Sequence, residues 1–171
     1  MKIKLTKKEK QDILELAKKR HDAKDRSFRN TSILSSDENK NKFNEKFSID
    51  KNYMPHYTGL VGEYVWAKAN NLQVDEEIYS VRDGGEDFKG TEVKTITYCG
   101  PGEPELKIKQ SEYESKTPNL YVLVRLNLSD DEVEILGTIT RDMFDKNKKS
   151  KRYGIGKPYN FVVPLSKMEK F

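Results

Sequence analysis

The most informative stretch of this chain is Thr91-Glu92-Val93-Lys94-Thr95-Ile96-Thr97. It is rich in β-branched residues and alternates in polarity, which predicts a β-strand. Alternate side chains of a strand share a face, so Glu92 and Lys94 point to the same side, roughly 7 Å apart along the strand. An acid and a base side by side on one face indicate either a surface charge ladder or a functional site.

A short turn before this strand brings a second carboxylate towards it. Asp87-Phe88 begins a short strand and Lys89-Gly90 turns the chain back, so the carboxylates of Asp87 and Glu92 can converge. Two carboxylates this close repel each other unless a cation lies between them. Mg²⁺, with Mn²⁺ as a substitute, suits such a pair, because it binds one or two carboxylates together with water and phosphate oxygens. Beside the metal, Lys94 could orient or deprotonate water and offset charge during phosphodiester hydrolysis.

The flanking sequence predicts a mixed α/β domain. Residues 6–23 read as a helix, with Thr6 and Glu9 as a capping box, and residues 58–69 as a second helix capped by Thr58. A short helix is expected from Ser111, with Glu114 completing a capping box. Alternation and β-branching predict further strands over 77–81, 120–126, 133–139 and 159–163.

Two further acids are candidates for the same site. Glu63 lies three or four residues from Leu60 and Ala67, and therefore on the buried stripe of the helix predicted over 58–69. A buried glutamate needs a partner, and a metal ion is one, although an acid early in a helix also complements the helix dipole. Asp83 precedes Gly84-Gly85 and is interpreted as a turn residue rather than a further ligand.

Composition excludes several other classes of protein. Cys99 is the only cysteine, so an intramolecular disulfide is impossible and a cysteine-based zinc site is not expected. Two histidines are too few for the usual histidine-metal nuclease or zinc hydrolase. No apolar run reaches the length of a membrane span, and the basic start Met1–Leu5 has no apolar segment after it. We therefore expect a cytoplasmic protein with no membrane partner.

The charge distribution adds a reason to expect a polyanionic partner. Residues 1–57 and 145–171 each carry a net charge of +6, whereas residues 58–144 carry −8. An acidic centre between basic ends suits a metal site whose substrate is held by flanking Lys and Arg. Lysine-rich ends are equally common as solvated surface. The residues expected to contact nucleic acid, DNA rather than RNA, are Lys148, Lys149, Lys151, Arg152 and Lys157.

The acids and the lysine around the predicted strand over 91–97 resemble the signature of the PD-(D/E)XK phosphodiesterase superfamily, which includes restriction endonucleases and phage nucleases. The resemblance is carried by Asp87-x4-Glu92-Val93-Lys94, by Gly62-Glu63 in the preceding helix and by Asp83-Gly84-Gly85-Glu86-Asp87. It spans roughly residues 58–126. One departure is Glu86, which stands where many members have proline.

The resemblance implies a restriction-endonuclease-like core, with helix, three strands, helix and strand around a mixed central sheet. It implies catalytic roles for Glu63, Asp87, Glu92 and Lys94, with Asp87, Glu92 and Glu63 as the metal ligands. The core is expected over 58–144. Residues 1–57 would form a basic helical extension packed on the core or wrapped around it, and residues 145–171 a basic extension with an edge strand.

Two alternatives to a self-sufficient nuclease stay open on the sequence. One is a catalytically inactive nucleic-acid-binding module with the same fold. The other is a subunit that depends on a partner, or on a second copy of the chain, for target recognition. The combination of two acids with Lys94 favours the active enzyme, because a binding module has no need for that arrangement.

Overall fold

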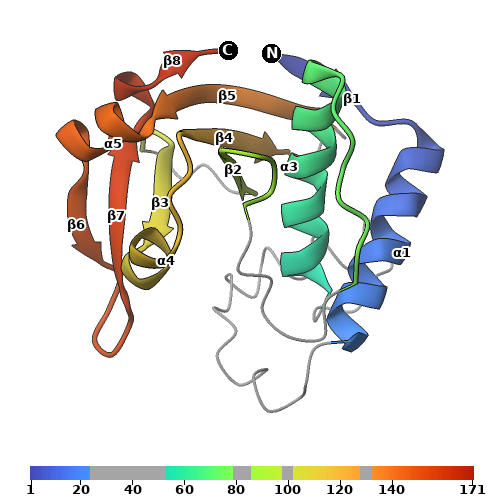
Figure 1. Ribbon diagram of the computed structural model, residues 1–171, viewed down its shortest axis with the longest axis horizontal. Coiled ribbons are helices and arrows are strands. Elements are labelled where there is room, and N and C mark those ends of the chain that lie inside the picture. Colours follow the sequence, from blue (N-terminus) through green and yellow to red (C-terminus); the bar gives the residue numbers. More distant parts are fainter. Residues whose placement is uncertain (24–52, 79–85, 98–101, 128–131) are drawn as a thin grey trace.

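The computed structural model describes residues 1–23, 53–78, 86–97, 102–127 and 132–171 (Figure 1). The predicted turn that contains Asp83, and most of the extension before residue 53, lie outside the described residues. No helix among the described residues has the length and apolar character needed to cross a membrane.

The main sheet, called sheet A, confirms the predicted mixed α/β class. Its strand order within the described chain is β1-β5-β4-β2, with β8 also paired to β5. β2 and β4 are parallel, and the other pairs are antiparallel. The strands are β1 (Lys2–Lys4), β2 (Thr91–Ile96), β4 (Leu120–Leu126), β5 (Glu132–Thr140) and β8 (Glu169–Lys170).

Two helices, α1 (Lys7–Ala23) and α3 (Met54–Asn70), pack against one another and cover one face of sheet A (Figure 1). Their apolar residues join Val93 of β2 and Val122 and Val124 of β4 in a core on the helix side of the sheet. The predicted capping box of α1 is confirmed, because Thr6 Oγ1 accepts from the Glu9 amide at 3.2 Å and Glu9 Oε2 accepts from the Thr6 amide at 2.5 Å.

A second sheet, called sheet B, covers the other side of sheet A. Its order within the described chain is β3-β7-β6, all antiparallel. Between the two sheets lies an inter-sheet core that includes Leu106, Ile108, Leu123 and Phe144. The remaining elements are β3 (Glu105–Lys109), α4 (Gln110–Ser115), α5 (Arg141–Asn147), β6 (Lys149–Arg152), β7 (Tyr159–Pro164) and the 3-10 helix η2 (Leu165–Lys167).

A β-bulge decides which face of sheet A the end of β5 occupies. The register shifts between Leu123 and Val124 of β4, which leaves Leu136 of β5 as the extra residue. Before the bulge, Ile135 belongs to the helix-side core, whereas Ile139 after it belongs to the inter-sheet core. The bulge thereby turns the apolar side chains in the second half of β5 from the helix side of sheet A to the side that faces sheet B.

Three predicted boundaries need correction. Helix α3 begins at Met54, one turn before the predicted start, and Thr58 is a buried residue inside it rather than its cap. Helix α4 begins at Gln110 after Lys109 and has no side-chain cap, so the capping box proposed at Ser111 is wrong. In the stretch predicted as a strand over 77–81, residues 77–78 form no strand and the others lie outside the described residues.

Helix α3 approaches β2 through a glycine, and this contact supports a stability prediction. A Cβ at Gly62 would lie 2.0 Å from Thr95 Oγ1 and 3.2 Å from Val93 Cγ1. We expect Gly62→Ala to lower the free energy of unfolding by about 1–3 kcal/mol through overpacking. Gly59→Ala on the same helix is the control, because nothing lies within 4 Å of its Cβ position. Urea denaturation should show Gly59→Ala at or above wild-type stability; equal losses in both variants would contradict this account.

Candidate active site

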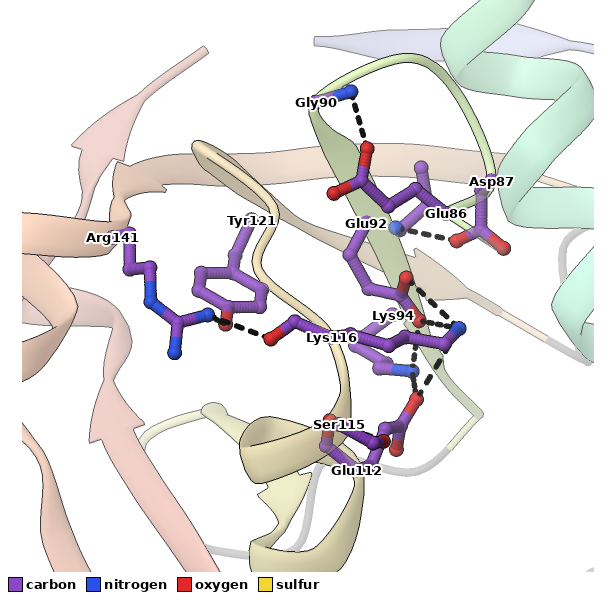
Figure 2. Close-up of polar contacts among 11 residues, drawn as sticks. Glu86, Asp87, Gly90, Glu92, Lys94, Glu112, Ser115, Lys116, Tyr121 and Arg141 are labelled. Carbon is purple, nitrogen blue, oxygen red and sulfur yellow. Dashed lines mark hydrogen bonds and ion pairs between the residues drawn. The ribbon is translucent and has the colours of Figure 1, made fainter. Parts of the chain in front are cut away.

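The turn before β2 holds two adjacent carboxylates in defined positions. Glu86 Oε2 accepts a hydrogen bond from the Gly90 amide at 2.6 Å, and Asp87 Oδ2 accepts one from the Val93 amide at 2.7 Å (Figure 2). Gly90 has φ +73°, a conformation that favours glycine. The turn therefore places Asp87 beside the start of β2, as the sequence predicted.

Glu92 is a buried acid on the face of β2 that points away from α3. It is 3% exposed, whereas its neighbour Val93 faces the helix-side core. Burial raises the pKa of Glu92 to about 6; Lys94 and Lys116 oppose this rise, and the charge of Asp87 adds to it.

Lys94 lies on the same face, between two carboxylates. Its Nζ donates to Glu92 Oε1 at 2.6 Å and also to Glu112 Oε1 of α4 (Figure 2). Burial disfavours its charge, but Glu92 and Glu112 outweigh burial and raise the pKa of Lys94 above its ordinary value. The same ion pair overcomes burial at Glu112 and lowers the pKa of that carboxyl. In this arrangement Lys94 is an ammonium group rather than a base.

A second lysine, Lys116, completes the group just after α4. Its Nζ lies 3.2 Å from both carboxylate oxygens of Glu92 and 4.0 Å from Glu112 Oε1. Arg141 of α5 fixes this part of the backbone, because its guanidinium donates to the Lys116 carbonyl at 2.9 Å and to the Tyr121 hydroxyl at 3.1 Å (Figure 2). The four charged residues, called here the charge cluster, are Glu92, Lys94, Glu112 and Lys116.

Two members of the charge cluster, Glu112 and Lys116, were missed by the sequence interpretation. They are separated from Lys94 by 18 and 22 residues, and only the packing of α4 beside β2 brings them there. One signal was available, since Glu112 and Lys116 have the i,i+4 spacing of a helical ion pair. That spacing alone does not show which strand the pair faces.

Glu63 is not brought into the charge cluster. Its Oε2 lies 3.6 Å from Nη1 of Arg20 in α1, on the helix side of sheet A. Gly62, next to it, packs against Val93 and Thr95, which point away from the face that carries Glu92. Within the described chain no group of three or more His, Cys, Asp or Glu residues is placed to hold a metal ion. The predicted three-carboxylate set is therefore not assembled.

The donor chemistry of the remaining pair fits a hard divalent cation. Asp87 and Glu92 supply only oxygen atoms, and one or two carboxylates are what Mg²⁺ takes from a protein. Burial is the main cause of the raised pKa of Glu92, and Lys94 and Lys116 offset it in part. Lys116 already contacts both oxygens of Glu92, so a cation at this carboxylate would have to compete with that ammonium group.

The basic residues predicted to bind nucleic acid do not form one surface. Lys148 is half-buried, paired with Asp145 at 2.7 Å and placed 4.0 Å from the ring centroid of Tyr113. Arg152 donates to the Lys157 carbonyl at 2.8 Å. Lys149, Lys151 and Lys157 are exposed, and Lys151 is paired with Glu105 at 3.0 Å. The sequence cluster is thus divided between different faces of the β6–β7 hairpin.

The chain matches no protein-family model, no curated protein and no solved structure at a significant level. The functional interpretation therefore depends on the geometry of Asp87 and the charge cluster.

Proposed function

We propose that this chain is a Mg²⁺-dependent nuclease of the PD-(D/E)XK type, an endonuclease acting on DNA. The observation that carries the proposal is the position of Asp87, Glu92 and Lys94 around the start of one strand, with Glu92 buried and Lys94 beside it. The parallel pairing of β2 with β4 in sheet A, with α3 before β2 and α4 before β4, supports part of the expected core. The expected run of three strands in one central sheet differs from the described chain, where β3 follows β2 but belongs to sheet B.

Asp87 and Glu92 would hold the metal ion, which when bound polarises the phosphate and lowers the pKa of a coordinated water molecule. Asp87 keeps its carboxylate in place through its bond to the Val93 amide. Lys94 contributes a fixed ammonium group, because its raised pKa keeps it protonated. Such a charge stabilises the additional negative charge that develops on the phosphate. Glu63 has no part in this ligand set, because its carboxylate pairs with Arg20.

Glu112 would act as a positioning residue. It accepts a hydrogen bond from Lys94 on the side of the ammonium group opposite Glu92, and so limits the rotamers that the lysine can adopt. Arg141 supports the charge cluster indirectly, because it holds the backbone of Lys116 in place. The cluster thereby presents a preorganised positive group, which costs little reorganisation during the reaction.

A structural role for the charge cluster is the competing interpretation, and one observation favours it. Two carboxylates and two ammonium groups balance each other, and such a network can simply attach α4 to sheet A. It would then suit a catalytically inactive binding module. The two interpretations differ over Asp87: the nuclease interpretation makes it a metal ligand, whereas the structural one leaves it the role of holding the turn through the Val93 amide.

The proposal is tested with circular and linear DNA, each single- and double-stranded, incubated with the purified chain and Mg²⁺. Cleavage of a closed circle would identify an endonuclease, and cleavage of linear DNA alone would identify an exonuclease. Absence of Mg²⁺-dependent cleavage of all four substrates would leave the structural interpretation of the charge cluster.

Replacing Lys116 with methionine should strengthen metal binding. Methionine keeps an unbranched side chain but removes the ammonium group that lies 3.2 Å from both Glu92 oxygens. An ion pair contribution of about 1 kcal/mol corresponds to roughly fivefold in affinity. Titrating Mn²⁺ against the melting temperature gives the apparent dissociation constant. The control is Lys89→Met, which removes an exposed lysine from the turn after Asp87. Equal affinities in the two variants would show that Lys116 and the metal do not share Glu92.

A further inference from the structure

Strand β3 of sheet B presents lysines on the face that points away from the inter-sheet core. Leu106 and Ile108 are buried in that core, whereas Lys107 and Lys109 are exposed. Side chains alternate along a strand, so the two lysines lie on the opposite, outward face, roughly 7 Å apart.

Strand β6 adds lysines to the same outward face because of its register with β7. Residues that oppose each other in neighbouring antiparallel strands lie on the same face. Val162 of β7 has Lys107 on one side and Lys149 on the other, and Asn160 likewise has a lysine on each side. The lysines in each row are about 10 Å apart across the central strand. The four residues, called here the lysine face, are Lys107, Lys109, Lys149 and Lys151.

An exposed aromatic ring lies among these lysines. Tyr153 is 42% exposed, and its ring centroid lies 4.5 Å from Lys107 Nζ and 5.1 Å from Lys151 Nζ. Its hydroxyl donates to Glu105 at 3.0 Å, and Lys151 pairs with the same carboxylate. Glu105 is the only acid in β3, β6 and β7, and the chain contains no Asp or Glu from residue 146 to residue 168. Positive charge is therefore in clear excess on this face.

We propose that the lysine face binds the sugar-phosphate backbone of duplex DNA. The excess of ammonium groups complements a polyanion that carries one charge per about 1.7 Å of helix axis. Lysine is a compact point charge that binds phosphate without the planar, bidentate fork of arginine. The contacts would therefore position DNA without selecting its sequence. The inference rests on the proposed function only in taking DNA as the ligand.

The lysine face is separate from the candidate active site. Tyr113 of α4 packs edge-on against Phe161 of β7, with 5.1 Å between the ring centroids. Phe161 opposes Ile108 and so belongs to the inward face of sheet B. Helix α4 and its Glu112 consequently lie on the side of sheet B opposite the lysine face. DNA bound to the lysine face would raise the effective concentration of neighbouring DNA segments at the active site.

The test measures affinity of the full chain for a fluorescently labelled DNA duplex in EDTA, over a range of salt concentrations. EDTA removes cleavage from the measurement. The test variant is Lys107→Gln/Lys149→Gln. The control is Lys8→Gln/Lys18→Gln, which removes the same charge from exposed positions of α1. Each lost phosphate contact should reduce the slope of log affinity against log salt by about 0.9. We expect the slope to decrease by about 1.8 in the test variant and to stay at the wild-type value in the control.

Equal slopes in the two double variants would overturn the assignment of the lysine face. So would a wild-type chain that binds vesicles containing phosphatidylserine but not the duplex, because the surface would then recognise a membrane. The two proposals can fail separately. If the slopes are as expected but the wild-type chain fails to cleave DNA in Mg²⁺, the lysine face is upheld and the proposed nuclease function is refuted. Melting temperatures equal to that of the wild type would verify that the substitutions in both variants leave the fold intact.

Discussion

Replacing Lys94 with alanine should remove most of the cleavage activity while leaving metal-dependent stabilisation in place. The lysine donates to Glu92 and Glu112 and is held as an ammonium group. An electrostatic group of this kind contributes about 3–4 kcal/mol to lowering the barrier, or roughly 10²–10³ in rate. The measurement is the single-turnover rate on duplex DNA at saturating enzyme, which separates the chemical step from substrate affinity.

The matched control for this variant is Lys89→Ala. Lys89 is exposed in the turn before β2, so its loss removes the same charge close to the site without disturbing Glu92 or Glu112. Its single-turnover rate should stay within a few fold of wild type. A Lys94→Ala protein that melts at the wild-type temperature and cleaves at the wild-type rate would exclude Lys94 from the chemistry.

Replacing Asp87 with asparagine should remove both the metal response and the cleavage. Binding of Mg²⁺ or Mn²⁺ to the native state alone raises the free energy of unfolding by RT ln(1 + [L]/Kd), or about 2.7 kcal/mol at a metal concentration one hundred times Kd. Asparagine keeps an oxygen that can accept from the Val93 amide, so the turn should persist while one carboxylate charge is lost. Thermal melts with and without millimolar metal should show a large shift for wild type and little or none for Asp87→Asn.

The chain offers a close control in the neighbouring residue. Glu86 also holds the turn through a backbone amide, that of Gly90, and Glu86→Gln likewise removes one charge and keeps an acceptor. Its melting temperature should rise with metal as in wild type. Identical metal-induced shifts in Asp87→Asn and wild type would remove Asp87 from the metal site, and a reduced shift in Glu86→Gln would make Glu86 the better candidate.

Sequence patterns correctly predicted those helices and strands that have a clear local signal of their own. The β-branched run of β2 and the apolar run of β4 were recognised within a residue of their bounds, and the capping box of α1 was correct. The start of α3 was misplaced because Thr58 resembles a cap, whereas Pro55 in the first turn begins the helix. β3 was missed although Leu106 and Ile108 alternate with charged residues, since the stretch is only five residues long.

In the candidate site, too, the sequence predicted the contacts that are local along the chain and missed those that depend on packing. Asp87, Glu92 and Lys94 are joined by a tight turn and one strand, so their proximity follows from local geometry. Lys116 reaches Glu92 only through the packing of α4, and no local pattern specifies that distance. Glu63 was expected in the site because it lies on a stripe with buried residues, but periodicity does not say which side of the sheet a helix covers. In the structure Glu63 pairs with Arg20.

Asp87, with Glu92, is proposed to support Mg²⁺-dependent hydrolysis of DNA. This role is tested most directly by incubating supercoiled circular DNA with metal-free wild-type chain and with metal-free Asp87→Asn, before and after Mg²⁺ is added. We expect nicked and then linear DNA to appear only with the wild type and only after Mg²⁺ addition. DNA that stays supercoiled with the wild type in Mg²⁺, or that is cleaved equally fast by Asp87→Asn, would contradict it.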